Sequence, residues 1–132
     1  MAANPYQKYK QVSILSASRE QILLMLYEGA IKFTKLAMKA IEEKKIADRG
    51  QNILRAYDII LELHATLDHK VGGELSKQLE QLYLFMMDQY TQANIKGDMA
   101  PLQANLKVLE NLYEGWKQAV EKIKKETENK GA

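Results

Sequence analysis

The chain of 132 residues carries 19 Lys and Arg and 17 Asp and Glu, for a net charge of +2, and contains no cysteine. The length suits one domain, the lack of cysteine excludes a disulfide framework and thiol chemistry, and the mixed charges argue against a nucleic-acid-binding surface. No apolar run reaches the ~18 residues of a transmembrane helix. With only two prolines and seven glycines, we expect a mostly helical cytoplasmic protein that does not insert into a membrane.

Residues 1–17 are predicted to form an N-terminal arm, or a short cap helix, rather than a helix of the core. Pro5 lies among polar residues and two tyrosines, Tyr6 and Tyr9, and the apolar Val12 follows. This composition favours an extended or short helical segment with apolar anchors.

The first long helix is predicted from Ser18 to about Lys44. Ser18 and Gln21 form a capping box, in which the serine hydroxyl accepts a hydrogen bond from the backbone N–H three residues on. Residues 22–27, ILLMLY, are all apolar, and at ~100° per residue six successive side chains point all the way round a helix. A helix of a small bundle buries only one stripe, so some of this surface is expected to await a partner. The second apolar stripe comprises Leu24, Tyr27, Ile31 and Met38.

The second helix is predicted to begin at Asp48, where Asp48 and Gln51 have the spacing of a capping box, and to end near His69. A tight reversal is predicted at Gly72 and Gly73, because glycine enters left-handed conformations cheaply. The inward-facing residues of this helix are predicted to be Ile53, Tyr57, Ile60, Leu63 and Leu67.

The third helix is predicted over residues 74–95, with a second all-apolar run at residues 82–87, LYLFMM. Leu84 falls on the polar row of this helix, so we expect it to be exposed or to face a partner. Met87 is also a candidate, because flexible thioethers suit grooves that accept another chain's helix. The predicted core stripe is Leu75, Leu79, Leu82, Met86, Tyr90 and Ala93.

The fourth helix is predicted from Pro101, which suits a first helical turn, to about Glu128. Gly97 and Asp98 are expected to end the third helix and cap the fourth, and residues 129–132 form a frayed tail. Four helices with short turns favour antiparallel neighbours. The prediction is an all-α, up-down four-helix bundle over residues 18–128. The inward stripe of the last helix is Leu102, Leu106, Leu109, Tyr113, Trp116, Val120 and Ile123.

The sequence lacks the motifs of a catalytic or metal site. There is no Glu-x-x-His pair of the kind that holds di-iron centres in bundles, no glycine-rich phosphate loop and no nucleophile elbow. His64 and Asp68 have i, i+4 spacing and could hold a metal, but a structural histidine is the more frequent case. We therefore expect no enzymatic activity, no metal and no cofactor.

Several segments together resemble the FliS family, the flagellin export chaperones of bacterial flagella. They are NPYQKYKQV near the N-terminus, SASREQILLMLYEGAIKFTKLA in the first helix, LHATLDHKVGGELSKQLEQLYLFMMDQYTQAN and, in the last helix, NLYEGW. They spread over nearly the whole chain. One departure is Ser18-Arg19, where many members carry Ser-Pro; both pairs suit a helix start.

The resemblance implies a chaperone in the bacterial cytosol that binds the disordered C-terminal segment of flagellin. It would prevent premature polymerisation and deliver flagellin to the gate of the flagellar type III export apparatus, without nucleotide or metal. Members of the family can also contact other flagellar regulators. The resemblance places arm contacts at Tyr6, Tyr9 and Val12, and groove contacts on the first helix at Leu24, Tyr27 and Ile31. The helical wheel adds Leu84 and Met87 as partner-binding residues.

Two other functions are consistent with the same apolar surface. A structural bundle could self-associate through it, and an adaptor could bind a main partner other than flagellin. Sedimentation at a series of concentrations separates the first from a chaperone, because a stable oligomer without client would favour self-association.

Overall fold

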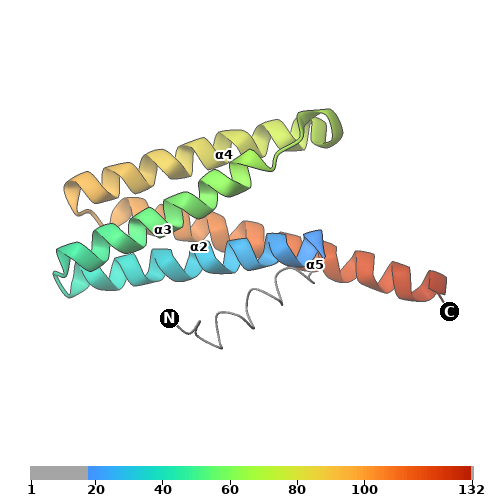
Figure 1. Ribbon diagram of the computed structural model, residues 1–132, viewed down its shortest axis with the longest axis horizontal. Coiled ribbons are helices and arrows are strands. Elements are labelled where there is room, and N and C mark those ends of the chain that lie inside the picture. The colour runs from blue at the N-terminus through green and yellow to red at the C-terminus, as the bar shows by residue number, and fades with distance from the viewer. Residues whose placement is uncertain (1–17, 132) are drawn as a thin grey trace, which may run out of the picture.

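The computed structural model describes residues 18–131, which form four helices and no strand within that range (Figure 1). The predicted arm contacts at Tyr6, Tyr9 and Val12 lie outside the described residues. The all-α prediction is confirmed. The helices are α2 (Arg19–Glu42), α3 (Ile46–Ala65), α4 (His69–Lys96) and α5 (Ala100–Gly131).

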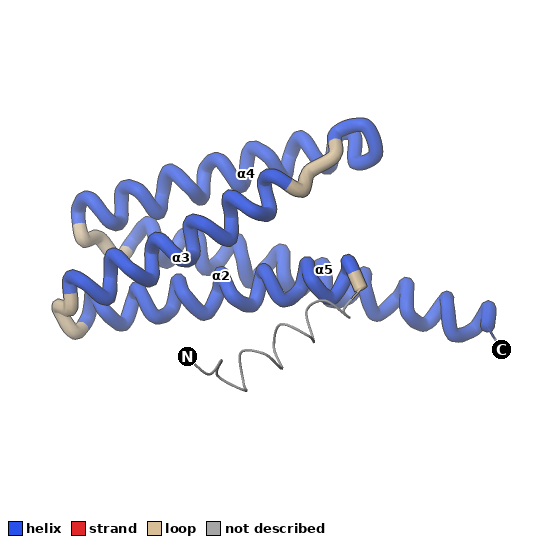
Figure 2. The backbone as a smooth tube through the Cα atoms, in the orientation of Figure 1, coloured by secondary structure: helices blue, strands red, loops and turns tan. Residues whose placement is uncertain are grey.

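The helices pack as an up-down bundle. α2 packs against α3 and α5, and α4 packs against the same two helices, while short connections join consecutive helices (Figure 2). Consecutive helices are therefore antiparallel, and α2 and α4 lie parallel to each other across the diagonal. It follows that the face between α3 and α4 and the face between α2 and α5 are on opposite sides of the bundle.

The helix starts follow the predicted capping only in part. The Ser18 hydroxyl accepts a hydrogen bond from the Gln21 N–H at 3.2 Å, as predicted. The second helix begins at Ile46, before the predicted Asp48, and its N-cap Lys45 makes no side-chain capping bond. Asp48 lies instead in the first turn, where its negative charge interacts favourably with the positive end of the helix dipole.

The turn between α3 and α4 is earlier than predicted. Asp68 caps α4 by accepting hydrogen bonds from two backbone N–H groups, so one helical turn precedes the glycines. Gly73, at φ 55° and ψ −128°, then breaks the helix. Leu75 follows this break and is exposed, which corrects its predicted place in the core. The reason is that α3 ends at Ala65, so that none of the four described helices lies opposite that turn along α3.

The core combines small side chains with three buried tyrosines. The hydroxyl groups of Tyr27 and Tyr83 form a hydrogen bond of 2.5 Å. Thr34 donates to the Ala30 carbonyl and lies 2.6 Å from the Tyr90 hydroxyl, which can donate to it. Both hydroxyl pairs connect α2 to α4 across the diagonal, so the bundle interior contains hydrogen bonds as well as apolar contacts. The apolar residues around them include Ala30, Ala37, Ala56, Ile60, Leu63, Met86, Ala93, Leu102 and Leu109.

The buried tyrosines make the fold sensitive to alkali. Burial raises the pKa of Tyr90 to about 12 and raises the pKa of both Tyr27 and Tyr83. In the unfolded chain a tyrosine loses its proton near pH 10. The contribution of these tyrosines to the free energy of unfolding is therefore expected to be fully present below that pH and to fall as the pH rises from about 10 to 12, because the unfolded chain then holds fewer protons. The check is a pH titration of tyrosinate absorbance and helical circular dichroism: these tyrosines should ionise only as helix is lost.

The last helix is longer than predicted. It continues past Glu128 to Gly131. Ile123 is exposed, which corrects its predicted inward position. In the antiparallel pair of α2 and α5, Tyr113 bonds to Glu28, so the part of α5 around residue 123 lies opposite the first residues of α2. Within the described residues 18–131, little neighbouring helix remains there for Ile123 to pack against.

Gly97 ends α4 in the left-handed conformation, with φ 65°. A Cβ there would lie 2.6 Å from Nη1 of Arg49, whose Nη2 donates to the Asn94 carbonyl. Replacing Gly97 with Ala is expected to lower the free energy of unfolding by about 1–2 kcal/mol. Gly115→Ala is the matched control: its Cβ meets open space inside α5, so the change should stabilise by about 0.5–1 kcal/mol. Urea denaturation of both variants measures this, and equal effects would contradict the argument.

Candidate partner-binding groove

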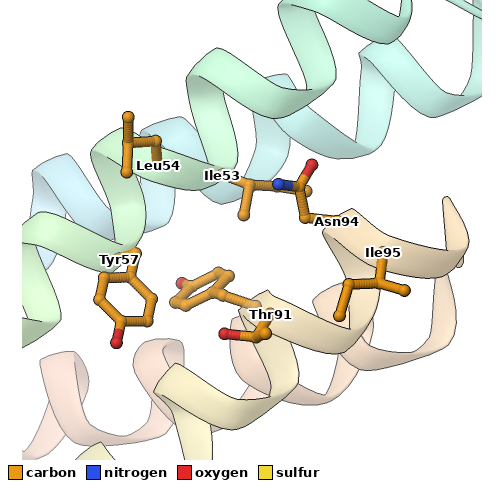
Figure 3. Close-up of a pocket in the computed structure, with 7 residues that line it drawn as sticks. Ile53, Leu54, Tyr57, Thr91, Asn94 and Ile95 are labelled. Carbon is orange, nitrogen blue, oxygen red and sulfur yellow. The ribbon is translucent and has the colours of Figure 1, made fainter.

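An apolar groove lies between α3 and α4 on the outer face of the bundle. It contains a cavity of about 220 Å³, and Figure 3 shows side chains of both helices around it. Tyr90 belongs to its floor, because it is buried. The lining residues are Ile53, Leu54, Tyr57, Tyr90, Thr91, Asn94 and Ile95.

The rims of the α3–α4 groove are apolar and exposed. Leu54 on α3 is 59% exposed and Ile95 on α4 is 72% exposed. Leu61 lies two helical turns after Leu54 on the same face of α3, and Leu84 lies on the face of α4 that carries Ile95; both are about half exposed. Exposed apolar side chains that line up over several turns of two neighbouring helices form a surface suited to the apolar face of another helix.

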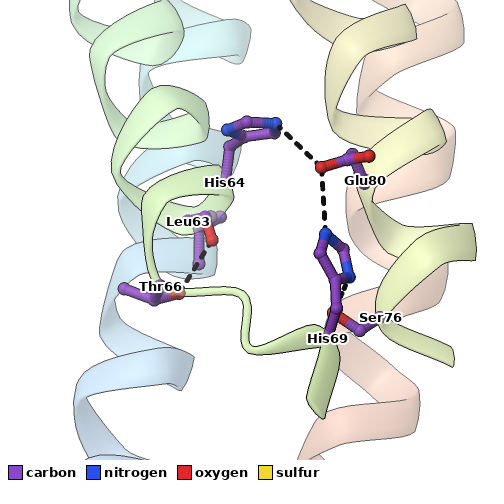
Figure 4. A network of polar contacts seen from close by, with 6 residues as sticks. All are labelled: Leu63, His64, Thr66, His69, Ser76 and Glu80. Carbon is purple, nitrogen blue, oxygen red and sulfur yellow. Dashed lines mark hydrogen bonds and ion pairs between the residues drawn. The ribbon is translucent and has the colours of Figure 1, made fainter. Parts of the chain in front are cut away.

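Polar contacts mark the two ends of the groove. At one end Arg49 donates to the Asn94 carbonyl at 3.1 Å. At the other end His64 and His69 lie 3.6 and 3.1 Å from the same Glu80 oxygen (Figure 4). The distance along α3 between these ends is about 22 Å at 1.5 Å per residue. The groove therefore accommodates roughly four turns of a partner helix.

The histidines have structural contacts. His69 Nδ1 lies 2.8 Å from the Ser76 hydroxyl, and both imidazoles face Glu80 across the α3–α4 turn. Asp68, the residue paired with His64 in the sequence prediction, caps α4 instead. Among residues 18–131 no group of three His, Cys, Asp or Glu side chains is arranged to hold a metal ion. In the same range, no helix has the length and apolar character needed to cross a bilayer.

Two predicted partner-binding residues lie in the core of the structure. Tyr27 has no exposed surface, and Met87 is only 7% exposed. Both belong to the hydrophobic core, where Tyr27 is bonded to Tyr83. Both help to hold the bundle together, and their part in partner binding remains a prediction.

The other predicted residues do not form one site. Leu84 is exposed, as expected, and shares a helical row of α4 with Ile95, which lines the α3–α4 groove. Leu24 is half-buried on α2. Ile31 is also half-buried and lines a different face, between α2 and α5. Their roles in binding remain predictions.

Sequence reasoning missed most of the groove. Leu54 and Leu61 are seven residues apart, so they share one face of α3, and that face is not the inward stripe predicted for this helix. Two apolar residues on an outer face were a sign of the groove that the sequence offered. Ile95 is at i+11 from Leu84 and lies on the same helical row. A search for apolar residues on the outer face of this helix would have identified Ile95. Tyr57 was expected to face inward and lies half-buried at the groove.

Comparisons with known proteins agree with this fold. The profile of the family described as flagellar protein FliS matches residues 2–123. The chain is 35% identical to the flagellar secretion chaperone FliS of Bacillus subtilis, over 97% of this chain and 95% of the relative. It is 36% identical to the flagellar secretion chaperone FliS of Vibrio cholerae, over 85% of each chain.

A solved structure shares the architecture. The crystal structure of a flagellar chaperone from bacteria superposes with a TM-score of 0.74 at 21% identity, over 89% of this chain and 95% of the other. At that identity the likeness concerns the fold. Together with the match of the family profile over most of the sequence, these comparisons show that the chain belongs to the FliS family of flagellar secretion chaperones.

Proposed function

We propose that this chain is a cytosolic export chaperone for flagellin. It binds the disordered C-terminal segment of flagellin, prevents premature polymerisation, and delivers flagellin to the flagellar type III export apparatus; other flagellar regulators are further partners. The observation that carries this proposal is the α3–α4 groove, whose rims carry exposed apolar side chains that do not belong to the hydrophobic core. Family membership supports the role, because the relatives are named as flagellar secretion chaperones.

The apolar surface of the α3–α4 groove limits the binding free energy that the groove alone can provide. Fully burying a leucine or isoleucine contributes about 1.5–3 kcal/mol, so the four roughly half-exposed rim residues offer roughly 3–7 kcal/mol. Ordering a disordered segment costs about 2–5 kcal/mol or more. The groove alone therefore gives weak binding, and a stable complex needs further contacts. Leu24 is our predicted contact outside the groove.

The proposed action needs no covalent step. A flagellin segment that is disordered when free forms a helix in the groove and is then unavailable to other flagellin molecules. Release at the export apparatus returns the segment to its disordered state. This non-enzymatic role is consistent with relatives that are chaperones.

The test is calorimetry with a peptide covering the last ~40 residues of flagellin from the same organism, a length that allows a helix in the groove and contacts beyond it. Helicity is followed in parallel by circular dichroism. We expect saturable one-to-one binding, with more helix in the mixture than in the separate components. Absence of both heat and helix gain would reject flagellin as the client. A concentration-dependent oligomer in sedimentation would then assign the groove to self-association.

A further inference from the structure

Another surface, the α4–α5 face, lies where the outer sides of α4 and α5 meet. Its residues on α4 recur at i, i+4, i+7, i+11 and i+14, so they follow one side of that helix for about 21 Å. None of its side chains is charged, although 27% of the residues of the chain are, so a partner can cover this face without burying an unpaired charge. The face consists of Gln78, Leu82, Phe85, Gln89 and Gln92 on α4 and Ala104, Val108 and Leu112 on α5.

The apolar side chains of the two rows lie at the same level of the bundle. The Asn105 Nδ2 group on α5 donates to the Met86 carbonyl on α4 at 2.9 Å, which fixes the register of this antiparallel pair. Phe85 therefore lies within about one helical turn of Val108. Phe85 is 47% exposed and Val108 is half-buried. One turn further along, each helix adds a half-buried leucine of the same face, so the face has an apolar centre.

Phe85 is the exposed residue among the phenylalanines and the tryptophan of the chain. Phe33 and Trp116 pack against the hydrophobic core, whereas Phe85 leaves about half of its surface in water. That exposure is unfavourable by about 25 cal/mol per Å² of apolar surface. Aromatic side chains are enriched at the centres of protein interfaces. An exposed ring beside half-buried apolar neighbours of two helices therefore indicates a contact surface.

The polar groups of the α4–α5 face suit a second copy of the same face. They are the side-chain amides of Gln78, Gln89 and Gln92, and an amide both donates and accepts hydrogen bonds, so it can pair with an identical amide. A two-fold interface brings a patch against itself, so a patch with charges of one sign would repel its own copy. Apolar groups and amides have no such conflict, and a net charge of only +2 makes two copies repel each other little.

We propose that two copies of this chain associate through their α4–α5 faces, in a two-fold dimer with both Phe85 rings at its centre. Helices packed about 8–10 Å apart, each about 10 Å across, give a face about 20 Å wide. The patch is therefore roughly 400 Å² per copy, about half of what each partner buries in a standard interface, so the dimer is transient, with a Kd of roughly 10–100 μM. The α3–α4 groove lies on the other side of α4 and stays open in the dimer.

The experiment is sedimentation of the full chain from about 5 to 500 μM, a range that brackets the expected Kd. The wild type should change from monomer to dimer over this range. Phe85→Asp should raise the Kd by about tenfold or more, because the two-fold symmetry places the change twice in the interface. Leu84→Asp is the matched control: the residue is adjacent, 50% exposed and on the groove side of α4, so the Kd should stay within about twofold.

Three results would overturn the proposal. The wild type could stay monomeric at the highest concentration. Equal losses in the two variants would attribute the effect to charge, and a loss in Leu84→Asp alone would assign self-association to the α3–α4 groove. If circular dichroism shows loss of helix in Phe85→Asp, the pair Phe85→Ser and Leu84→Ser replaces the first pair. The measurement contains no flagellin, so its outcome is independent of the proposed function.

Discussion

Replacing Tyr27 with Asp is expected to unfold the bundle at neutral pH. The side chain has no exposed surface, and its hydroxyl is bonded to that of Tyr83. Removing a buried aromatic ring costs about 3–5 kcal/mol, and the carboxylate adds an unpaired charge in the core. Since domains of this size are stable by about 5–15 kcal/mol, the variant should lose most or all of its stability. Far-UV circular dichroism with urea denaturation measures this.

Tyr27→Phe is the control for this change. It keeps the ring and removes only the hydroxyl, which leaves the Tyr83 hydroxyl without its partner at a cost of about 1–3 kcal/mol. This variant should fold and bind the flagellin tail peptide with unchanged affinity. If Tyr27→Asp instead kept its helix and its urea midpoint and lost only peptide binding, Tyr27 would be a groove residue, as the family resemblance implies.

The double variant Leu54→Asp, Ile95→Asp is expected to weaken binding of the flagellin tail peptide by about a hundredfold, or nearly 3 kcal/mol. Each change removes an exposed rim residue of the α3–α4 groove, and each puts a carboxylate where an apolar helix face must dock. Stability should change little, because neither residue belongs to the core. Calorimetry measures the affinity, and circular dichroism measures the fold.

Val71→Asp with Ile123→Asp is the matched control for the groove variant. Both residues are exposed and apolar, and both lie outside the α3–α4 groove. The change in charge is the same, so an effect of charge alone would appear equally in both variants. Binding lost equally in both, or retained in the groove variant, would remove the groove from the proposed function.

The helices could be predicted because their signals are local. The apolar period and the breaks at Gly73 and Gly97 depend on neighbours within a few residues, and so does the Ser18 cap. Helix starts were less certain: α3 begins without a side-chain cap, so the Asp48 motif marked its first turn and not its boundary.

The division between core and groove could not be predicted, because it depends on contacts far apart in the sequence. In a run of six apolar residues the wheel cannot choose which side faces inward. Tyr27 is placed in the core by the hydroxyl of Tyr83, 56 residues away. Likewise, the α3–α4 groove exists only because the outer rows of two helices lie side by side, and neither row alone defines it.

The two hydroxyl pairs between α2 and α4 restrict how these helices can align in a bundle that also carries exposed apolar side chains. Helices that are apolar on several sides can slide or rotate with little loss of hydrophobic contact. Both pairs here have the same separation of 56 residues. A slip of two turns would join Tyr27 to Tyr90 and leave the Tyr83 hydroxyl without its partner, at about 1–3 kcal/mol for a buried group, while Thr34 would keep only its bond to the Ala30 carbonyl. Only one of these two alignments satisfies every hydroxyl, so the bundle can keep apolar side chains exposed on its surface and still adopt a single packing.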